Sequence, residues 1–305
     1  SRGGPTVQRM GTTSPTPDEI VQRVRDLPAM PLVVTQVLRA TRDPDSSVAD
    51  VAQILGTDQG LTARVLRLAN SALFGFPRRV ATLTDAVVLL GFSTLRSLVL
   101  AGTAFGLLNR AVSGYSLDKG ALWRHSMGAG VAARLVCQRQ RLRRLTEEAF
   151  VAGVLHDMGK LVLDTYVREQ FSQIIQRVEE NREPFMAAER AILGYDHAQL
   201  GAMAAETWAL PADLCEAIRL HHEPPPWSEP RLFHVVHVAD VIALSLGMGL
   251  GSDGLNYAVD SGAMETLGLS GADVEELISQ MPDALTDIDT FLGEDGGAAG
   301  GGGAA

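Results

Sequence analysis

The sequence has few cysteines and few aromatic residues. It contains two cysteines in 305 residues, Cys137 and Cys215, and they lack the C-x-x-C spacing of zinc-binding or redox motifs. We therefore expect no disulfide framework and two reduced, buried thiols. Aromatic residues make up only 5% of the chain. This is less than β-sheet proteins usually contain, and it favours helices packed through aliphatic side chains.

Basic residues are also in the minority. The 26 Lys and Arg residues are outnumbered by 36 Asp and Glu residues, which gives a net charge of -10. Binding to nucleic acid normally requires a basic surface, so we expect no nucleic-acid partner. A local basic cluster at residues 134–144 is explained by a solvated helix end, where cations are favourable.

The sequence has no apolar run of the length that a membrane-spanning helix needs. The longest candidate, residues 95–108, is interrupted by Arg96, Ser97, Gly102 and Gly106. The first residues also lack the basic and then apolar pattern of a signal peptide. We therefore predict a cytoplasmic protein that does not contact the membrane.

The patterns that are present indicate helices. Four segments begin with residues that can cap a helix: Thr16-Pro17-Asp18-Glu19, Ser47 with Asp50, Thr82 with Asp85, and Ser270 with Asp273. One apolar stripe has the helical spacing i, i+4, i+7, i+8: Leu61, Val65, Leu68 and Ala69. No convincing period-two alternation occurs. The predicted fold class is all-α.

The chain divides into five predicted regions. Residues 1–15 are a disordered N-terminus, and residues 16–110 form an N-terminal helical subdomain. Small and polar residues at 109–120 mark a boundary. A second helical subdomain, which contains the histidines, spans residues 118–250, and a C-terminal helical extension spans 251–292. Residues 293–305, almost entirely Gly and Ala, are a flexible tail.

Histidines and aspartates in apolar segments suggest a metal site. His156-Asp157 lies in the apolar stretch 150–160, where a buried charge costs several kcal/mol unless a partner compensates it. A hydrogen-bonded His–Asp pair in the core is the alternative. His125 on the preceding helix and Asp240 on a later apolar helix extend the pattern. Mixed nitrogen and oxygen ligands suit Fe, Mn, Ni, Co or Zn better than Ca.

Two parts of the sequence together resemble one family. The first comprises Leu27-Pro28-Ala29-Met30-Pro31, residues 54–62, and Leu68-Ala69-Asn70-Ser71-Ala72-Leu73-Phe74-Gly75 with its flanks. It is similar to the HDOD family, the HD-related output domains of bacterial signalling proteins. Residues 125–240 resemble the HD half of the same module. The resemblance covers about residues 16–250, and it implies a multi-helix fold in which the N-terminal subdomain packs on an HD-like bundle.

The resemblance also implies roles for particular residues. In the HD superfamily, the positions of His125, His156, Asp157 and Asp240 hold a metal ion. In HD-GYP phosphodiesterases, histidines in stretches corresponding to His197 and His221-His222 bind a second ion, so one or two divalent ions are expected here. For His221 and His222, C-terminal helix capping is the alternative. Small residues after His197 would let its helix pack closely, whereas His234 and His237 are expected to be packing or surface residues.

Two functions follow from these patterns. The first is a signal-output module that acts through signalling proteins or a small nucleotide-like ligand, and we favour it. The second is a metal-dependent phosphohydrolase or phosphodiesterase, with Asp157 bridging two ions and Lys160, four residues after His156 on the same helix face, contacting phosphate. The Gly-Tyr-Pro motif of HD-GYP enzymes is missing, because Pro224-Pro225-Pro226-Trp227 follows the histidine pair. This absence weakens a cyclic-dinucleotide phosphodiesterase assignment.

Overall fold

The computed structural model describes residues 19, 22, 24, 29–76, 79–166, 170–249, 251 and 258–286. Over these residues the regular elements are helices, and the one β-type pairing is an isolated bridge between Val112 and Leu117. The all-α prediction is therefore confirmed. The predicted cap at Thr16 and both predicted terminal tails lie outside the described residues.

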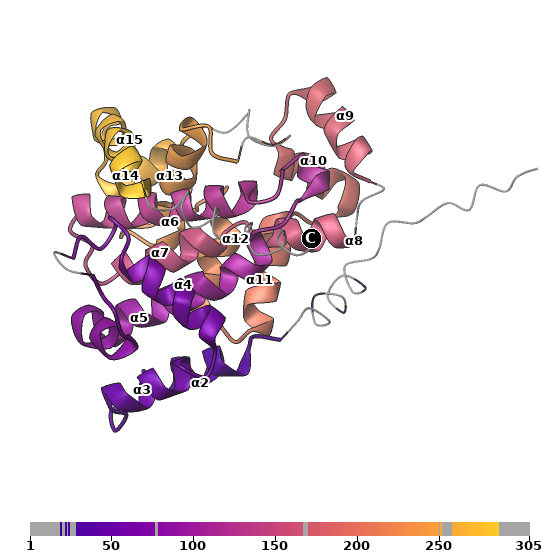
Figure 1. Ribbon diagram of the computed structural model, residues 1–305. Helices are drawn as coiled ribbons and strands as arrows, with labels where there is room; N and C mark the ends of the chain where they lie inside the picture. Colours follow the sequence, from indigo (N-terminus) through magenta and orange to yellow (C-terminus); the bar gives the residue numbers. More distant parts are fainter. Residues whose placement is uncertain are drawn as a thin grey trace, which may run out of the picture.

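Four helices form the lower end of the molecule in Figure 1. They are α2 (Leu32–Ala40), α3 (Val48–Leu55), α4 (Gln59–Ala69) and α5 (Leu83–Leu108). Ser47 and Thr82 cap α3 and α5 as predicted, because their side chains accept hydrogen bonds from the Asp50 and Asp85 amides. Gly91 interrupts α5 with a φ of 74°, a left-handed conformation that glycine adopts without steric cost.

By length and composition, α5 could cross a membrane, but half of its most apolar window is buried inside the protein. The helix packs against α3, α4 and α7. Its residues Leu95, Leu98 and Val99 are fully buried. The apolar character of α5 is thus explained by a central place in the core.

The 3₁₀ turn η1 (Ser113–Tyr115) links these helices to the histidine-bearing half. That half contains α6 (Ala121–Arg139), α7 (Thr146–Leu155), α8 (Gly159–Tyr166), α9 (Phe171–Asn181), α10 (Phe185–Leu193), α11 (His197–Thr207), α12 (Ala212–Leu220) and α13 (Leu232–Ser245). Helices α14 (Ser261–Leu267) and α15 (Gly271–Leu285) follow and lie beside α13 and α6 (Figure 1). The division near residues 109–120 stays a prediction, because α5 packs on α7 across it.

Close packing in this half depends on glycine. A Cβ on Gly153 would lie 2.7 Å from the Ala129 carbonyl oxygen, so α6 and α7 approach backbone to backbone. A Cβ on Gly159 would lie 1.8 Å from the carbonyl oxygen of His197. The first turn of α8 therefore contacts the first turn of α11, and this contact brings residues 156–160 next to His197.

Two local predictions are wrong. The segment Thr146-Glu147-Glu148 predicts a helix cap at Thr146, but the N-cap of α7 is Leu145, without a side-chain cap, and the Thr146 hydroxyl donates to the Leu142 carbonyl. The helix also does not continue through the His-Asp pair: α7 ends at Leu155, residues 156–158 form a turn, and α8 begins at Gly159. Lys160 therefore does not share a helix face with His156. The cap at Ser270 is confirmed as a capping box with Asp273.

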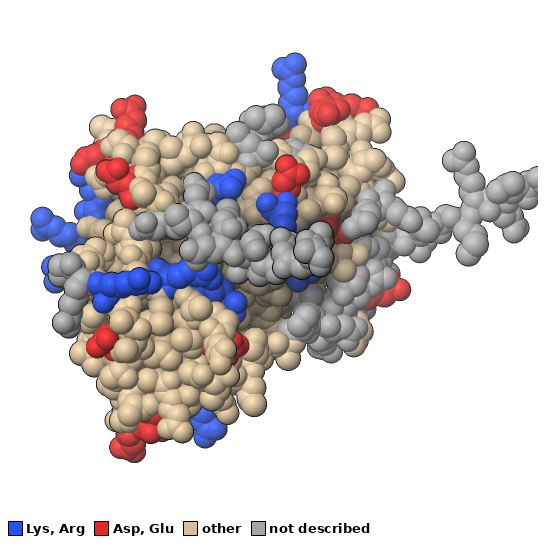
Figure 2. All heavy atoms as spheres, in the orientation of Figure 1, with Lys and Arg blue, Asp and Glu red and all other residues tan. Residues whose placement is uncertain are grey.

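The surface carries its charges unevenly. In Figure 2, Lys and Arg side chains form a short band across the middle of the face drawn, over the region of α4, while Asp and Glu lie mainly toward its edges. The basic cluster at residues 134–144 falls at the end of α6, as predicted. Arg134 there pairs with Glu147 at 2.6 Å. Both cysteines are free and buried, and burial raises the pKa of Cys137 to about 12.

Candidate metal centre

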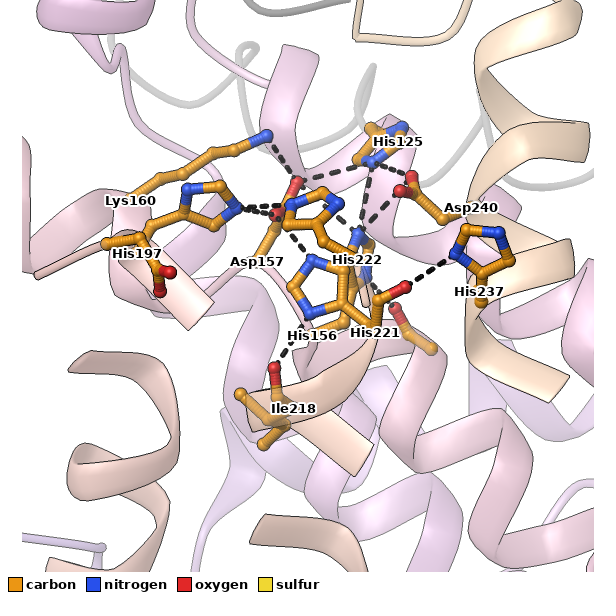
Figure 3. Close-up of polar contacts among 12 residues, drawn as sticks. His125, His156, Asp157, Lys160, His197, Ile218, His221, His222, His237 and Asp240 are labelled. Atoms are coloured by element: carbon orange, nitrogen blue, oxygen red, sulfur yellow. Dashed lines mark hydrogen bonds and ion pairs between the residues drawn. The ribbon is translucent and has the colours of Figure 1, made fainter. Parts of the chain in front are cut away.

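Histidines and aspartates from five parts of the fold point toward one centre (Figure 3). They are His125 on α6, His156 and Asp157 in the turn after α7, His197 at the start of α11, His221 and His222 directly after α12, and Asp240 on α13. The structure thus brings together all seven predicted ligand residues. Each lies at a helix end or on a helix face that packs on its neighbours, so the backbone fixes its position.

The first group of donor atoms surrounds His125. Its Nε2 lies 3.1 Å from Asp240 Oδ1, 3.3 Å from Asp157 Oδ2 and 3.2 Å from His156 Nε2. Ligands bound at about 2.1 Å around one ion lie roughly 3.0–3.4 Å apart at octahedral or tetrahedral angles. The separations in this group therefore match those of a common coordination shell.

The second group lies on the other side of Asp157. Asp157 Oδ1 is 3.4 Å from His197 Nε2 and 3.9 Å from His221 Nε2. The Nε2 atoms of His197 and His222 are 2.8 Å apart. Donor atoms of these four residues all lie within 4.8 Å of one another. Asp157 thus directs one carboxylate oxygen at each group.

The outer nitrogens of the histidines are held by acceptors. Nδ1 of His156 and of His221 each contact a backbone carbonyl at 2.7 Å, those of Gly153 and Ile218. Nδ1 of His125 contacts the Met248 carbonyl at 3.2 Å. Because a carbonyl can only accept, Nδ1 carries the proton in these rings, and Nε2 of the neutral ring presents its lone pair to the centre.

The centre is almost closed to solvent, and it leaves polar atoms unsatisfied. Six of the seven side chains are no more than 5% exposed, and only His222 is half-buried. Asp157 Oδ1, His221 Nε2 and Asp240 Oδ1 are buried without a hydrogen bond. Each such atom costs about 1–3 kcal/mol, and a bound cation would remove the cost. The residues therefore fit a divalent metal.

The protonation of these groups also favours a cation. Burial raises the pKa values of Asp157 and Asp240, but the neighbouring histidines outweigh it and hold both pKa values well below the usual range. Burial lowers the pKa of His156, but the carboxylates of Asp157 and Asp240 outweigh burial and raise this pKa to about 10. Burial, with the charge of His156 next, lowers the pKa of His221 to about 3. Without a metal, two ionised carboxylates, a protonated His156 and a neutral His221 therefore face one small volume.

Three other predicted residues take different places. Lys160 is buried, and its Nζ donates to Asp157 Oδ2 at 2.6 Å, so its charge faces the centre and not the solvent. Nδ1 of His237 contacts the His221 carbonyl at 2.8 Å, which supports the backbone that carries a ligand residue. The His234 ring accepts from the Arg231 amide at the start of α13. His234 and His237 are thus packing residues, as predicted, and they are buried rather than on the surface.

The structure adds Glu189 and Tyr115, which the sequence analysis missed. Glu189 is fully buried, and its Oε2 contacts His197 Nδ1 at 2.7 Å and accepts from the His197 amide at 3.0 Å. The Tyr115 hydroxyl donates to the other carboxylate oxygen of Glu189. The sequence contained a signal for Glu189, because this residue lies four positions from both Phe185 and Leu193 on the apolar, buried face of α10. An unexplained carboxylate on such a face indicates a buried partner.

The fold and the site define a helical module of the HD type. Residues 27–224 match the family model of the HDOD domain, and the chain belongs to this family. The resemblance inferred from the N-terminal motifs and the histidine pattern is therefore confirmed.

Relatives of known structure share this architecture. The chain is 26% identical to an HDOD domain protein of unknown function from Geobacter sulfurreducens, with a TM-score of 0.70 over 90% of this chain and 96% of that one. It is 27% identical to a "Putative phosphohydrolase" of Shewanella amazonensis SB2B, with a TM-score of 0.70 over 90% and 97%. An uncharacterized protein of Treponema pallidum (strain Nichols) is 26% identical over 68% of this chain. This chain spans 39% of the length of that protein.

Proposed function

We propose that the chain is a signal-output module whose histidine-bearing half binds a pair of divalent metal ions. The carboxylate of Asp157 supports this most directly, because its Oδ2 faces His125 and His156 and its Oδ1 faces His197 and His221. A carboxylate placed between two sets of imidazole nitrogens is suited to bridging two ions. A single hydrogen-bonded His–Asp pair would leave the second set unexplained.

The ligand sets differ in composition. His125, His156, Asp157 and Asp240 would hold one ion, and Asp157, His197, His221 and His222 would hold the other. Imidazole and carboxylate together suit Fe, Mn, Ni, Co or Zn, whereas Ca and Mg prefer oxygen ligands only. A pair of such ions can lower the pKa of water and neutralise phosphate charge.

The closed environment of the centre favours signalling over turnover. Most of the ligand side chains are fully buried, and the Gly-Tyr-Pro motif is missing. In this proposal the ions stabilise one arrangement of the helices, and the module acts in the cytoplasm through a partner protein or a small ligand. Metal binding would then couple to folding, because the ligands come from five separate segments.

Metal analysis tests this proposal. Protein purified without chelator, then loaded separately with Mn, Fe, Co, Ni or Zn, should hold two equivalents of at least one ion. Its melting temperature should fall after chelation, since a ligand at 100 times its dissociation constant adds about 2.7 kcal/mol to stability. Protein that holds no ion after loading, with an unchanged melting temperature, would contradict the proposal.

A second candidate is a metal-dependent phosphohydrolase, and Lys160 is the observation that favours it. Its ammonium group is buried and lies at the centre, 2.6 Å from Asp157 Oδ2. From this position Nζ could hold the charge of a phosphate while Asp157 remains with the ions. Hydrolysis of bis(4-nitrophenyl) phosphate by the metal-loaded protein is the test. Activity should disappear in Lys160→Met with the metal content retained, and it should persist in the exposed control Lys119→Ala.

A further inference from the structure

A cleft of about 430 Å³ lies where the N-terminal helices meet the histidine-bearing half. Its walls come from α2 and the residues after it, from α5, from α7 and from the turn between α11 and α12. Arg39, Arg42 and Arg96 all line it, and we call it the arginine cleft. None of its lining residues belongs to the metal centre.

The guanidinium groups of the arginine cleft have few counter-charges. Arg39 and Arg42 are exposed at its rim, and neither makes an ion pair with any residue in the described part of the chain. Arg96 is half-buried, and its Nη1 donates to the Thr41 carbonyl at 3.0 Å. Burial, and then the nearby charge of Arg42, lower the pKa of Arg96, while Glu148 opposes them. The positive charges of Arg42 and Arg96 therefore repel each other at this wall.

The acidic residues of the cleft do not neutralise it. Glu147 is engaged by Arg134 at 2.6 Å, so its charge is already compensated. Burial, and then the charge of Asp213, raise the pKa of Glu148. The charges of Arg96 and Arg42 lower this pKa, but by less. Among the described lining residues, one available carboxylate thus faces three guanidinium groups, which leaves an excess of positive charge.

Most of the remaining lining residues are apolar, and Thr35, Ser93 and Ser97 are the polar ones. Leu38, Leu100, Val151, Leu210 and Trp208 contribute aliphatic and indole surface to the same cavity. A volume of this size is typical of pockets for small organic molecules, which combine apolar walls with a few polar groups. Arginine binds phosphate, sulfonate and carboxylate groups with two parallel hydrogen bonds. The lining therefore matches a molecule with an apolar or aromatic body and an anionic group.

We propose that the arginine cleft binds a small organic anion of this kind, with its charged group on Arg39, Arg42 and Arg96 and its body against Trp208 and its apolar neighbours. Helix α7 gives the site a physical link to the metal centre, because Glu148 and Val151 line the cleft and the same helix ends at Leu155, directly before His156. The inference deepens the proposed signalling role by naming the class of ligand. Binding in the cleft does not itself require the metal ions.

The probe for this test is 8-anilinonaphthalene-1-sulfonate, an aromatic anion whose fluorescence rises in apolar surroundings. We expect saturable binding at one site per folded chain, with energy transfer from tryptophan that falls markedly in Trp208→Phe and leaves only the contribution of Trp123 and Trp227. Arg39→Ala with Arg42→Ala should weaken binding by about tenfold or more, because charge-assisted hydrogen bonds are lost. The matched control is Arg143→Ala with Arg144→Ala, which removes the same charge from exposed residues that do not line the cleft. The control should bind as the unmodified protein does.

Three results would overturn the inference. They are equal binding by both double variants, equal binding of the uncharged analogue N-phenyl-1-naphthylamine, and tryptophan energy transfer that is undiminished in Trp208→Phe. Melting temperature and metal content are measured on each variant, and both should be unchanged because Arg39 and Arg42 are exposed. Absence of bound metal from the unmodified protein, with probe binding as expected, would count against the metal centre and not against the cleft. A loss of probe binding with metal retained in the control would count against the cleft alone.

Discussion

The helices α2–α5 and the helices α6–α13 bury different kinds of side chain. Among the described residues before η1, the buried polar side chains are the hydroxyls of Thr41, Ser71 and Ser97. Every buried histidine, lysine, aspartate and glutamate that the structure describes lies between residues 125 and 240. One half is thus held by apolar packing, and the other buries a network of charges.

This difference shows what each half needs in order to be stable. Apolar burial contributes roughly 25 cal/mol per Å², and it needs no ligand. A buried charge, in contrast, costs several kcal/mol unless a partner compensates it. We therefore expect mutations in α2–α5 to change stability alone, and mutations near Asp157 to change stability and metal binding together.

The largest effect is expected at Gly159. In Gly159→Ala the new methyl group would meet the His197 carbonyl oxygen at 1.8 Å and the Gly201 amide at 2.6 Å, and both are backbone atoms. We expect a loss of more than about 4 kcal/mol in urea unfolding, together with the loss of bound metal. The control is Gly106→Ala in α5, where no atom lies within 4 Å and a gain of about 0.5–1 kcal/mol is expected. Equal stability of the two variants would refute the close contact.

Truncation of a buried apolar side chain in helices α2–α5 should change stability alone. Leu98→Ala removes a fully buried side chain from α5, and we expect a loss of about 3 kcal/mol in the free energy of unfolding. The metal content of the folded protein should not change. Val88→Ala in the same helix is the control, because Val88 is 66% exposed and should change stability by less than about 0.5 kcal/mol. Loss of metal in Leu98→Ala would show that the halves are not separable in this way.

A smaller effect is expected when the contact between Glu189 and His197 is weakened. Glu189→Gln keeps the shape of the side chain but removes the charge that faces His197 Nδ1. Changes of this type lower metal affinity by about 10-fold to 100-fold, and we expect this loss for one of the two ions. Tyr115→Phe leaves the Glu189–His197 contact in place and should have a weaker effect. Calorimetric titration of the metal-free protein distinguishes the two sites, and unchanged affinities in Glu189→Gln would argue against this support.

Per pH unit, the smallest effect is a dependence of metal affinity on pH. A metal ion and a proton compete for His156 Nε2, and the pKa of His156 in the metal-free protein is raised to about 10. The ring is therefore protonated at pH 7, and metal binding must release this proton. Affinity should rise with pH by at least about tenfold per unit between pH 6 and 8. Titrations in buffers of different ionisation enthalpy count the protons, and an affinity independent of pH would contradict the protonated His156.

The sequence predicted the helical fold because its signals are local. The caps at Ser47, Thr82 and Ser270 and the apolar stripe of α4 depend on residues three or four positions apart. The turn at residues 156–158 was missed because an apolar segment looks the same in one helix or in two. What separates α7 from α8 there is the packing of Gly159 on His197, which no local pattern records.

The candidate ligands were predictable, but their arrangement was not. Histidine and aspartate in apolar segments are costly, so their positions alone indicated a common partner. Which Asp157 oxygen faces which histidines depends on side-chain orientation and on contacts between distant helices. The same holds for Glu189, whose partner His197 becomes apparent only when α10 and α11 are placed together.

The central claim is that Asp157 is shared by two ions, and metal stoichiometry tests it most directly. Folded protein, Asp157→Ala and Asp240→Ala are loaded with the same ion, and bound metal is counted by elemental analysis. We predict two ions for the unmodified protein, one for Asp240→Ala and none for Asp157→Ala. One ion in the unmodified protein, or equal losses in the two variants, would contradict a shared carboxylate.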